Sequence, residues 1–413
     1  MTNGGSETYV VVGAGLAAGK AVEALREAGF DGRVILYGAE RERPYERPPL
    51  SKDYLMGNSA LDDAFVHPPE WYDEHRVELR LATEVTQIDP ATRIVVDADG
   101  DRQKYDKLLL TTGSSPRRLA MADDSGAPVA YLRTVGDCER IKSSLTAGRR
   151  IAVIGGGWIG LEVASAARQA EAEVTVIEVA ELPLLRVLGH EVAQIFADLH
   201  SSHGVDLRTG ATITSIDKDG DAAVVHLSDG SAVEADLLVV GVGISPNTAV
   251  AESAGLAVDN GVVVDDHLRT SDPSIYAAGD VANAQHPTLG RPIRVEHWDN
   301  AIEQGVVAGK NMTGGDVAYD RLPYFFTDQY DLGMEYVGHV GPDGYDDVVL
   351  RGDPEEYVFT AFWLAGGHVV AGMQANDWDA MDAVRKIVSA GGRVAVEALR
   401  DESRSLAQIV PED

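Results

Sequence analysis

Tyr9-Val-Val-Val-Gly-Ala-Gly-Leu-Ala-Ala-Gly19 is the stretch that decides the fold, because it runs from a short apolar strand through a glycine-rich turn into an amphipathic helix. It fits the pattern G-x-G-x-x-G/A, with Gly13, Gly15 and Ala18 at the fixed positions. The first glycine permits a tight turn, the second lets the backbone approach a diphosphate, and the third position keeps the helix close to the strand. The stretch therefore predicts a nucleotide diphosphate resting on the free amides of a helix N-terminus.

A second copy of the pattern follows in Ile151-Ala-Val-Ile-Gly-Gly-Gly-Trp-Ile-Gly-Leu-Glu162, where Gly155, Gly157 and Gly160 take the fixed positions. One match to this pattern is weak evidence, but two matches in the correct context are much stronger. We therefore predict an α/β fold with two Rossmann-like dinucleotide-binding units. A chain with two such sites is expected to pass electrons between two nucleotides.

An acidic residue after the second strand of each unit would contact an adenosine ribose. In the second unit this residue is Glu178, whose carboxylate can accept bonds from a 2′-hydroxyl but would repel the 2′-phosphate of NADP. The second site is therefore expected to prefer NAD. In the first unit the candidate is Glu40, which could equally be a solvated loop charge.

Size and composition limit the possible classes of protein. The chain has 413 residues, 45% of them hydrophobic and 24% charged, which fits a globular protein of roughly three domains. A net charge of -31 without any basic run argues against nucleic-acid binding. No apolar run is long enough to span a membrane, and the N-terminal residues lack the features of a signal peptide, so we expect a cytoplasmic protein.

Thiol and metal chemistry are not expected. The single cysteine, Cys138, leaves no pair for a disulfide, a metal site or a redox couple within the chain. His190, His200 and His203 suggest a metal site, but His200 and His203 with Glu191 fit the polar, solvated face of a helix better. We expect no metal.

Three further segments add to these motifs, and the first of them, a proline-rich motif that ends in lysine, is far more specific than either glycine motif. They are Arg43-Pro-Tyr-Glu-Arg-Pro-Pro-Leu-Ser-Lys52, Tyr276-Ala-Ala-Gly-Asp-Val-Ala282 and Arg294-Val-Glu-His-Trp-Asp-Asn-Ala301. With these segments, essentially the whole chain resembles the FAD-dependent NADH:ferredoxin reductases of oxygenase systems, the family of putidaredoxin reductase and the biphenyl dioxygenase reductase. The prolines also predict that the first segment is a rigid loop.

The resemblance implies a division into domains and a function. The FAD-binding domain would consist of residues 1–113 and 243–320, and the NAD-binding domain of residues 114–242. Residues 321–413 would form a C-terminal α+β interface domain. Hydride would pass from NADH to non-covalently bound FAD, and single electrons would then pass to a small ferredoxin, most simply a two-iron one. That ferredoxin would feed a cytochrome monooxygenase or a Rieske dioxygenase.

The resemblance also assigns roles to individual residues. Lys52 would lie near the reactive ring nitrogen of FAD and pair with Glu162, and Trp298 would line the flavin. A cation there stabilises the reduced flavin, and a buried carboxylate partner offsets the cost of desolvating the lysine. Asp280 would bond the ribityl chain. The implied FAD residues are Gly13, Gly15, Ala17, Ala18, Glu40, Arg47, Lys52, Val85, Thr112, Gly113, Arg133, Gly279, Asp280 and Trp298. The implied NAD residues are Gly155, Gly157, Ile159, Gly160, Glu162, Glu178 and Gly243.

The chain departs from the family pattern at positions that concern electron transfer and docking. Phe326 stands where the family often has tryptophan, and Glu335 stands where a relative has a docking lysine. Ferredoxins are usually acidic, so docking to this acidic chain calls for a locally basic face. The candidate basic residues are Arg291, Arg294, Lys310, Arg321 and Arg351.

Two other functions use the same two-nucleotide plan. One is a rubredoxin reductase or an NADH oxidase, which differs from a ferredoxin reductase only in the electron acceptor. The other is a flavoprotein whose NADH-dependent state is read by a protein partner, as in relatives of apoptosis-inducing factor. Fast NADH-dependent reduction of a ferredoxin would distinguish a ferredoxin reductase from both of these alternatives.

Overall fold

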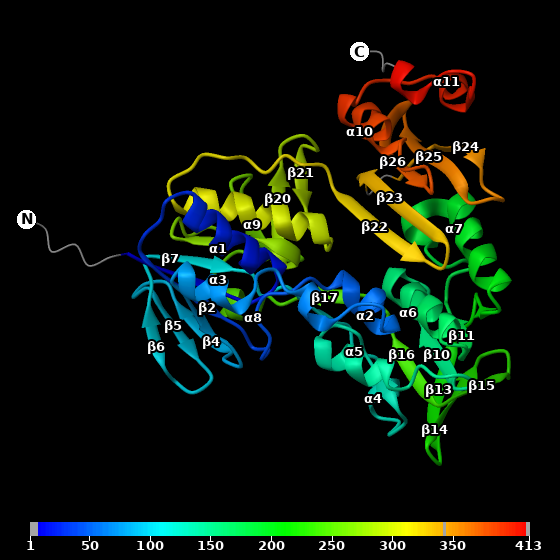
Figure 1. Ribbon diagram of the computed structural model, residues 1–413, viewed down its shortest axis with the longest axis horizontal. Coiled ribbons are helices and arrows are strands. Elements are labelled where there is room, and N and C mark those ends of the chain that lie inside the picture. The colour runs from blue at the N-terminus through cyan, green and yellow to red at the C-terminus, as the bar shows by residue number, and fades with distance from the viewer. Residues whose placement is uncertain (1–6, 342–343, 410–413) are drawn as a thin grey trace, which may run out of the picture. The chain divides into compact units, whose positions relative to one another are not determined.

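The structure, a computed structural model, describes residues 7–341 and 344–409 (Figure 1). The chain divides into two compact units. Unit 1 contains Met1–Arg47, Ala60–Ser115 and Ile244–Pro323, and unit 2 contains Pro48–Ser59, Pro116–Gly243 and Tyr324–Asp413. Each unit is built around one of the two glycine-rich turns that the sequence predicts.

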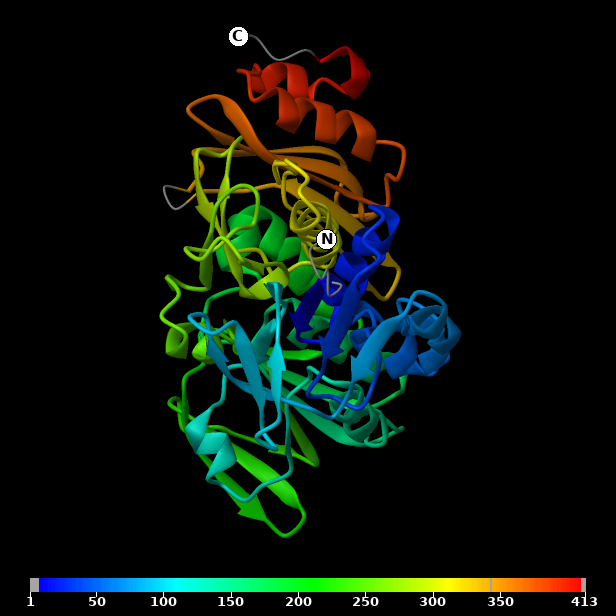
Figure 2. The same cartoon turned by 90° about the vertical axis from the view of Figure 1, so that its left-hand side faces the viewer.

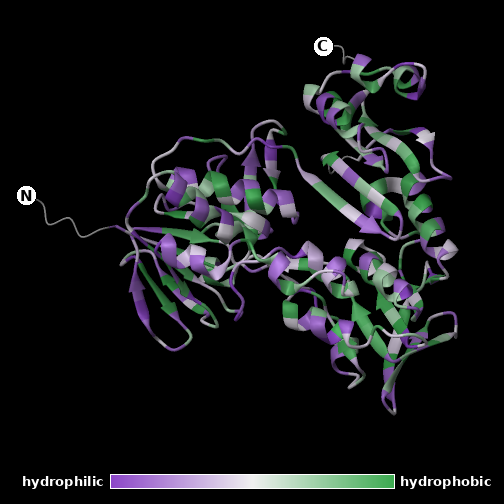
Figure 3. Ribbon diagram, in the orientation of Figure 1, coloured by the Kyte–Doolittle hydropathy of each residue, from purple (hydrophilic) through white to green (hydrophobic). Residues whose placement is uncertain are grey.

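The core of unit 1 is a five-stranded parallel sheet in the order β19-β7-β1-β2-β3. Its strands are β1 (Thr8–Val12), β2 (Arg33–Tyr37), β3 (Val77–Arg80), β7 (Lys107–Leu110) and β19 (Ile275–Ala277). Four of them, β1, β2, β7 and β19, are mainly apolar and buried, as expected of a parallel sheet that is covered on both faces, whereas β3 alternates apolar and charged residues. Figure 3 shows hydrophobic stretches along the strands of this sheet.

Two helices of unit 1 pack unusually closely. They are α1 (Leu16–Glu27) and α9 (Trp298–Met312). A β-carbon at Gly305 would lie 2.4 Å from the carbonyl oxygen of Ala17, and one at Gly309 would lie 2.6 Å from that of Ala21. These glycines let α9 pack directly on the backbone of α1, just after the nucleotide turn.

Smaller elements complete unit 1. Two small sheets join the core, in the orders β4-β5-β6 and β18-β20-β21. The first contains β4 (Val85–Asp89), β5 (Ile94–Asp97) and β6 (Arg102–Lys104), and the second β18 (Val262–Val264), β20 (Ala282–His286) and β21 (Arg291–Ile293). The short helices are α3 (Pro69–Glu74), α8 (Ala249–Ser253) and the 3-10 turns η2 (Leu61–Ala64) and η3 (Gly279–Val281). A two-stranded ladder pairs β8 (Ser114–Pro116) with β17 (Ile244–Pro246).

Unit 2 repeats the plan with a five-stranded parallel sheet in the order β12-β11-β10-β16-β9. Its strands are β9 (Val129–Ala130), β10 (Arg150–Ile154), β11 (Glu173–Ile177), β12 (Asp206–Arg208) and β16 (Leu237–Val240). A small antiparallel sheet is formed by the hairpin of β14 (Ala222–Leu227) and β15 (Ala232–Ala235), beside β13 (Ile213–Asp219). The helices are α2 (Asp53–Met56), α4 (Ala120–Asp123), α5 (Val135–Lys142), α6 (Trp158–Gln169) and α7 (Leu185–Ser202).

The last part of unit 2 is a five-stranded antiparallel sheet in the order β22-β23-β26-β25-β24. The strands are β22 (Tyr324–Gln329), β23 (Leu332–Gly338), β24 (Asp347–Asp353), β25 (Val358–Ala365) and β26 (His368–Ala375). α10 (Met381–Ala390) lies on one face of this sheet, followed by α11 (Val396–Arg400) and the turn η4 (Leu406–Gln408), drawn red in Figure 2. These elements form the C-terminal α+β part of the predicted fold.

The proline-rich segment is not wholly irregular, because Pro48–Ser51 forms a turn of 3-10 helix, η1. Lys52 follows it and is the N-cap residue of α2. The prolines fix φ close to the value that such a turn needs, so they shape this turn rather than prevent it. The turn and α2 place Ser51 and Lys52 in unit 2.

Candidate active site

The glycine turn of unit 1 contains one glycine that the fold requires and one that it does not. Gly13 has φ +106°, and a β-carbon there would lie 2.2 Å from the carbonyl oxygen of Thr111, so no larger residue fits. Gly15 has φ -89° and ψ -169°, which any residue adopts. A β-carbon on Gly15 would meet no atom of the described chain within 4 Å. Folding alone therefore does not explain a glycine at this position.

The glycine turn of unit 2 shows the same contrast. Gly155 has φ +106°, and a β-carbon added there would lie 2.4 Å from the carbonyl oxygen of Gly241. A β-carbon added at Gly160 would lie 2.1 Å from the carbonyl oxygen of Gly155. Gly157 has φ -83° and ψ -179°. Nothing in the described part of the chain lies within 4 Å of its β-carbon position. Gly157, like Gly15, leaves backbone open to a ligand.

Both turns fit a diphosphate electrostatically. They lead into α1 and α6, where the described residues provide neither an acidic side chain in the first turn nor a side-chain cap. The free amides and the positive end of the helix dipole therefore stay available to an anion. Two open, uncapped turns of this kind are what two dinucleotides need.

Glu178 lies directly after β11 and is held by backbone amides. Its Oε2 accepts a hydrogen bond from the amide of Gly156 at 2.6 Å, and its Oε1 accepts one from Ala180 at 2.8 Å. The carboxylate is thus fixed beside the glycine turn, as the sequence predicts for a ribose ligand.

Three large apolar side chains of unit 2 are exposed in the segments that follow β10, β11 and β16: Ile159, Val179 and Val242. Gly243 follows the last of these with φ +99°.

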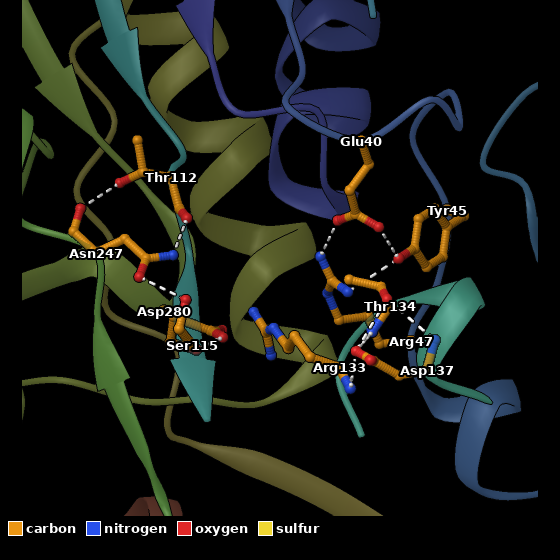
Figure 4. Close-up of polar contacts among 11 residues, drawn as sticks. Glu40, Tyr45, Arg47, Thr112, Ser115, Arg133, Thr134, Asp137, Asn247 and Asp280 are labelled. Atoms are coloured by element: carbon orange, nitrogen blue, oxygen red, sulfur yellow. Dashed lines mark hydrogen bonds and ion pairs between the residues drawn. The ribbon is translucent and has the colours of Figure 1, made fainter. Parts of the chain in front are cut away.

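In unit 1, Glu40 is not a solvated loop charge, because two side chains bind it (Figure 4). Tyr45 donates a hydrogen bond to Oε2 at 2.5 Å, and Arg47 pairs with Oε1 at 2.9 Å. A side chain held by an arginine and a tyrosine has a fixed position next to the strand end where a ribose is expected.

The other predicted flavin residues of unit 1 lie at strand ends and helix starts. Thr112 follows β7, and its hydroxyl donates to the carbonyl of Asn247 at 2.8 Å, while the Asn247 amide returns a bond to the Thr112 carbonyl at 2.8 Å (Figure 4). Gly113 follows with φ +66°. Ala17 lies in the first turn of α1, and Val85 is a buried residue at the start of β4.

Asp280 lies in η3, and its carboxylate is hydrogen-bonded to a residue outside that turn. The Ser114 hydroxyl donates to its Oδ2 at 2.6 Å. The preceding Gly279 has φ +79°, and its amide donates to Gln304 of α9 at 2.8 Å. Trp298 is the first residue of α9 and is half-buried.

Arg133 belongs to unit 2, in contrast to most of the other predicted flavin residues. It lies just before α5, and its amide donates to Asp137 Oδ2 at 3.2 Å (Figure 4). Thr134 and Asp137 form a capping box that fixes this helix start.

Lys52 and Glu162 form a buried ion pair within unit 2. Lys52 Nζ lies 2.6 Å from Glu162 Oε1, and the two side chains are only 11% and 4% exposed. Glu162 accepts two more hydrogen bonds, from Ser51 Oγ at 2.5 Å and from Thr327 Oγ1 at 2.6 Å. Ser51 lies inside the quoted proline-rich motif, but nothing in the sequence pattern connects Thr327 with Glu162. Phe326 lies beneath the pair, with Lys52 Nζ 5.4 Å from its ring centroid.

His200 is not on a solvated helix face, and that expectation is wrong. The side chain is fully buried in unit 2, and its Nε2 lies 2.8 Å from Gln329 Oε1. Burial lowers the pKa of His200 to about 4, so the ring is neutral near pH 7. The helical pattern of α7 places His200 against β22 because the last turns of this helix are covered by the C-terminal sheet.

Cys138 is a buried residue of α5. Burial raises the pKa of its thiol to about 12, so a thiolate nucleophile is not available near neutral pH. Electrons must therefore leave the nucleotide sites without passing through this side chain.

Three of the five candidate docking cations have partners inside their own unit. Arg321 pairs with Asp299 through two bonds of 2.7 Å, and Arg294 pairs with Glu296. Arg351 donates to the carbonyls of Leu399, Asp401 and Arg404. The charges of Arg294 and Arg321 are thus offset by neighbouring carboxylates, whereas Arg351 keeps its charge but is held in place by backbone carbonyls. Within residues 7–341 and 344–409, no helix has both the length and the apolar character that crossing a bilayer requires.

Comparison with known proteins gives consistent matches along the chain. The pyridine nucleotide-disulphide oxidoreductase family matches residues 7–305, and a reductase C-terminal family matches residues 324–410. The ferredoxin–NAD(+) reductase component of the anthranilate 1,2-dioxygenase system of Burkholderia cepacia is 41% identical, over 97% of this chain and 98% of its own. The rubredoxin–NAD(+) reductase of Pseudomonas putida is 36% identical, over 83% and 88%. The solved covalent complex of putidaredoxin reductase with putidaredoxin matches with a TM-score of 0.93 at 35% identity, over 98% of each chain.

Proposed function

Because the chain belongs to the pyridine nucleotide-disulphide oxidoreductase family, we propose that it is an FAD-containing ferredoxin reductase that uses NADH. FAD takes the turn at Gly13 and Gly15, and NAD the turn at Gly155, Gly157 and Gly160. One observation carries the assignment of the two nucleotide sites. No described atom lies within 4 Å of the β-carbon positions of Gly15 and Gly157, so the fold itself does not require glycine there, whereas a bound diphosphate would.

The protein would contribute position and charge, whereas the redox chemistry, acceptance of a hydride from NADH and release of single electrons, would be supplied by FAD. Lys52 supplies a positive charge that favours the reduced cofactor. Glu162 keeps that ammonium group in place and offsets the cost of its burial. Glu40 and Arg47 hold the adenosine end of FAD, and Asp280 with Thr112 holds the chain between adenosine and flavin.

The remaining predicted residues complete the two sites. We assign Ala17, Val85, Arg133 and Trp298 to the FAD site as well. Ile159 and Gly243 line the NAD site beside Glu178. We also propose that the protein acts in the cytoplasm.

The electron acceptor is a small iron–sulfur ferredoxin that serves an oxygenase. The name of the Burkholderia cepacia relative, a ferredoxin reductase of a dioxygenase system, supports this assignment, as does the solved complex of putidaredoxin reductase with its protein partner putidaredoxin. The purified protein should reduce a two-iron ferredoxin with NADH faster than it reduces oxygen or a rubredoxin. A higher rate with rubredoxin would favour the function named for the Pseudomonas putida relative. Faster turnover with oxygen alone would favour an NADH oxidase, and slow turnover with an NADH-induced dimer would favour a binding module.

Replacing Glu178 by alanine should reduce the preference for NADH over NADPH by about tenfold or more. The carboxylate contributes bonds to a 2′-hydroxyl and repulsion of a 2′-phosphate, and each 1.4 kcal/mol is about one tenfold step. The measurement is kcat/KM with each nucleotide. Glu181→Ala, which removes an exposed charge from the same loop, is the matched control and should leave the ratio unchanged. An unchanged ratio in the Glu178 variant would remove the basis for NAD selectivity.

Ferredoxin reduction should become faster as salt is raised from low ionic strength. The chain has a net charge of -31, and Arg294, Arg321 and Arg351 are engaged internally, so long-range repulsion of an acidic ferredoxin dominates. The measurement is cytochrome reduction through the ferredoxin at increasing salt. A rate that falls steeply with salt would instead require a locally basic docking face.

A further inference from the structure

The buried face of β22 carries two polar side chains where apolar ones would ordinarily pack. Side chains alternate along a strand, and Phe325, Thr327 and Gln329 share the buried face. Thr327 is 1% exposed and Gln329 is fully buried. Burying a hydroxyl and an amide costs free energy unless each is hydrogen-bonded, so their partners indicate what they do.

These partners form one continuous chain of hydrogen bonds that ends on Glu162. Thr327 Oγ1 lies 2.6 Å from Glu162 Oε1, the oxygen that also binds Lys52. Gln329 Nε2 lies 3.2 Å from Thr327 Oγ1, and Gln329 Oε1 lies 2.8 Å from His200 Nε2. The other ring nitrogen of His200 lies 3.3 Å from the Tyr330 hydroxyl. All these residues belong to unit 2.

The carboxylate at one end fixes the direction of every bond. A carboxylate only accepts, so the single hydroxyl proton of Thr327 must point to Glu162. The amide group facing Thr327 must then be the donor NH₂ of Gln329, which leaves its oxygen to accept from His200 Nε2–H. His200 Nδ1 is in turn the acceptor for the Tyr330 hydroxyl. Each donor therefore points toward Glu162, and aligned donors polarise one another.

The neutral state of His200 agrees with this direction, because its Nδ1 can accept a bond only when the ring is uncharged. The chain is nevertheless unsuited to conducting protons. Gln329 interrupts it with an amide, which donates and accepts hydrogen bonds but does not readily exchange a proton between its oxygen and its nitrogen. Its contribution to the site is therefore orientation and electrostatic support of Glu162.

We propose that Thr327, Gln329 and His200 are positioning residues for the flavin reaction, which fix Glu162 and through it the ammonium group of Lys52. This inference rests on the proposed function, in which Lys52 favours the reduced flavin. Without the Thr327 hydroxyl, Glu162 loses one of the donors on the oxygen that holds Lys52, and the ammonium group moves away from its working position.

The test uses the FAD-loaded protein and Thr327→Val, which keeps the shape of the side chain and removes the donor. Flavin reduction at saturating NADH should slow by about tenfold. The two-electron reduction potential should become more negative by about 30 mV, which corresponds to a tenfold change in the equilibrium. The dissociation constant for NADH should change little, because the hydrogen bonds of Thr327 go to Glu162 and Gln329 and not to Gly155, Gly157 or Gly160.

Four further variants separate positioning from packing. Thr327→Ser restores the donor and should recover the rate and the potential. Thr360→Val removes a buried threonine hydroxyl from β25 that has no hydrogen-bond partner among the described residues, so it should behave like the natural protein. In a Lys52→Met background, Thr327→Val should add nothing, since it acts through Lys52. Gln329→Met, one step further along the chain, should have a smaller effect than Thr327→Val.

Failure of the inference and failure of the proposed function give different results. Bound flavin that NADH does not reduce in the natural protein would overturn the function before any variant is compared. If Lys52→Met slows reduction while Thr327→Val matches Thr360→Val in rate, in potential and in denaturant unfolding midpoint, the positioning chain is wrong and the function stands. Additive effects of Lys52→Met and Thr327→Val would also overturn it.

Discussion

Flavin reduction by NADH should slow by about 100-fold in Lys52→Met, because a preorganised charge aimed at developing negative charge accounts for rate effects of this size. Stopped-flow absorbance of the FAD-loaded variant under saturating NADH is the measurement. The affinity for NADH should change little, since Lys52 is the N-cap residue of α2 and not part of the glycine turn of unit 2. A variant that reduces its flavin at the natural rate would contradict the role of Lys52.

Stability has to be controlled in this experiment. Removing Lys52 leaves Glu162 buried without its cation, which costs about 3–5 kcal/mol in other proteins. The double variant Lys52→Met with Glu162→Gln removes the uncompensated charge and should regain most of the stability without regaining the rate. Lys386→Met, which changes an exposed lysine of α10, should affect neither quantity.

The second large effect is expected at the glycines of unit 2, where two similar substitutions should fail in different ways. Gly160→Ala places a β-carbon 2.1 Å from the carbonyl oxygen of Gly155, so the turn and α6 must separate. We expect a loss of several kcal/mol in the free energy of unfolding, which is the size typical of an overpacked site. Denaturant unfolding measures this loss.

Gly157→Ala should leave that stability within about 0.5 kcal/mol, because the added methyl meets nothing in the described chain within 4 Å. The methyl group would occupy the space expected for the NAD diphosphate, so NADH binding should weaken at least tenfold. Titration with NADH measures the dissociation constant. A Gly157→Ala protein that binds NADH normally would remove the observation on which the site assignment rests.

The sequence predicted the nucleotide-binding elements well because their signals are local. The glycine spacing defines each strand, turn and helix start, and α1 begins at Leu16, directly after the first glycine turn. The pairing of Lys52 with Glu162 was also expected, although only from the family resemblance, and the structure shows the contact. Glycine positions and acidic residues at strand ends are read directly from the chain.

What could not be predicted depends on contacts between distant segments. His200 follows a helical pattern that fits a solvated face, and only the packing of β22 against α7 buries it. Thr327 and Gln329 look like ordinary polar residues of an edge strand until Glu162 is known to lie beside them. Arg321 reads as a surface charge, but the bidentate bond to Asp299 fixes it to α9. Sequence periodicity does not reveal which element covers which face.

The most direct test of the central claim is an anaerobic titration of the purified, FAD-loaded protein with NADH, followed by the absorbance of the oxidised flavin. Stoichiometric bleaching by NADH, and recovery of the colour when an oxidised two-iron ferredoxin is added, is the expected result. A folded protein that binds no FAD, or whose bound flavin keeps its colour in excess NADH, would contradict the claim that its two sites exchange electrons.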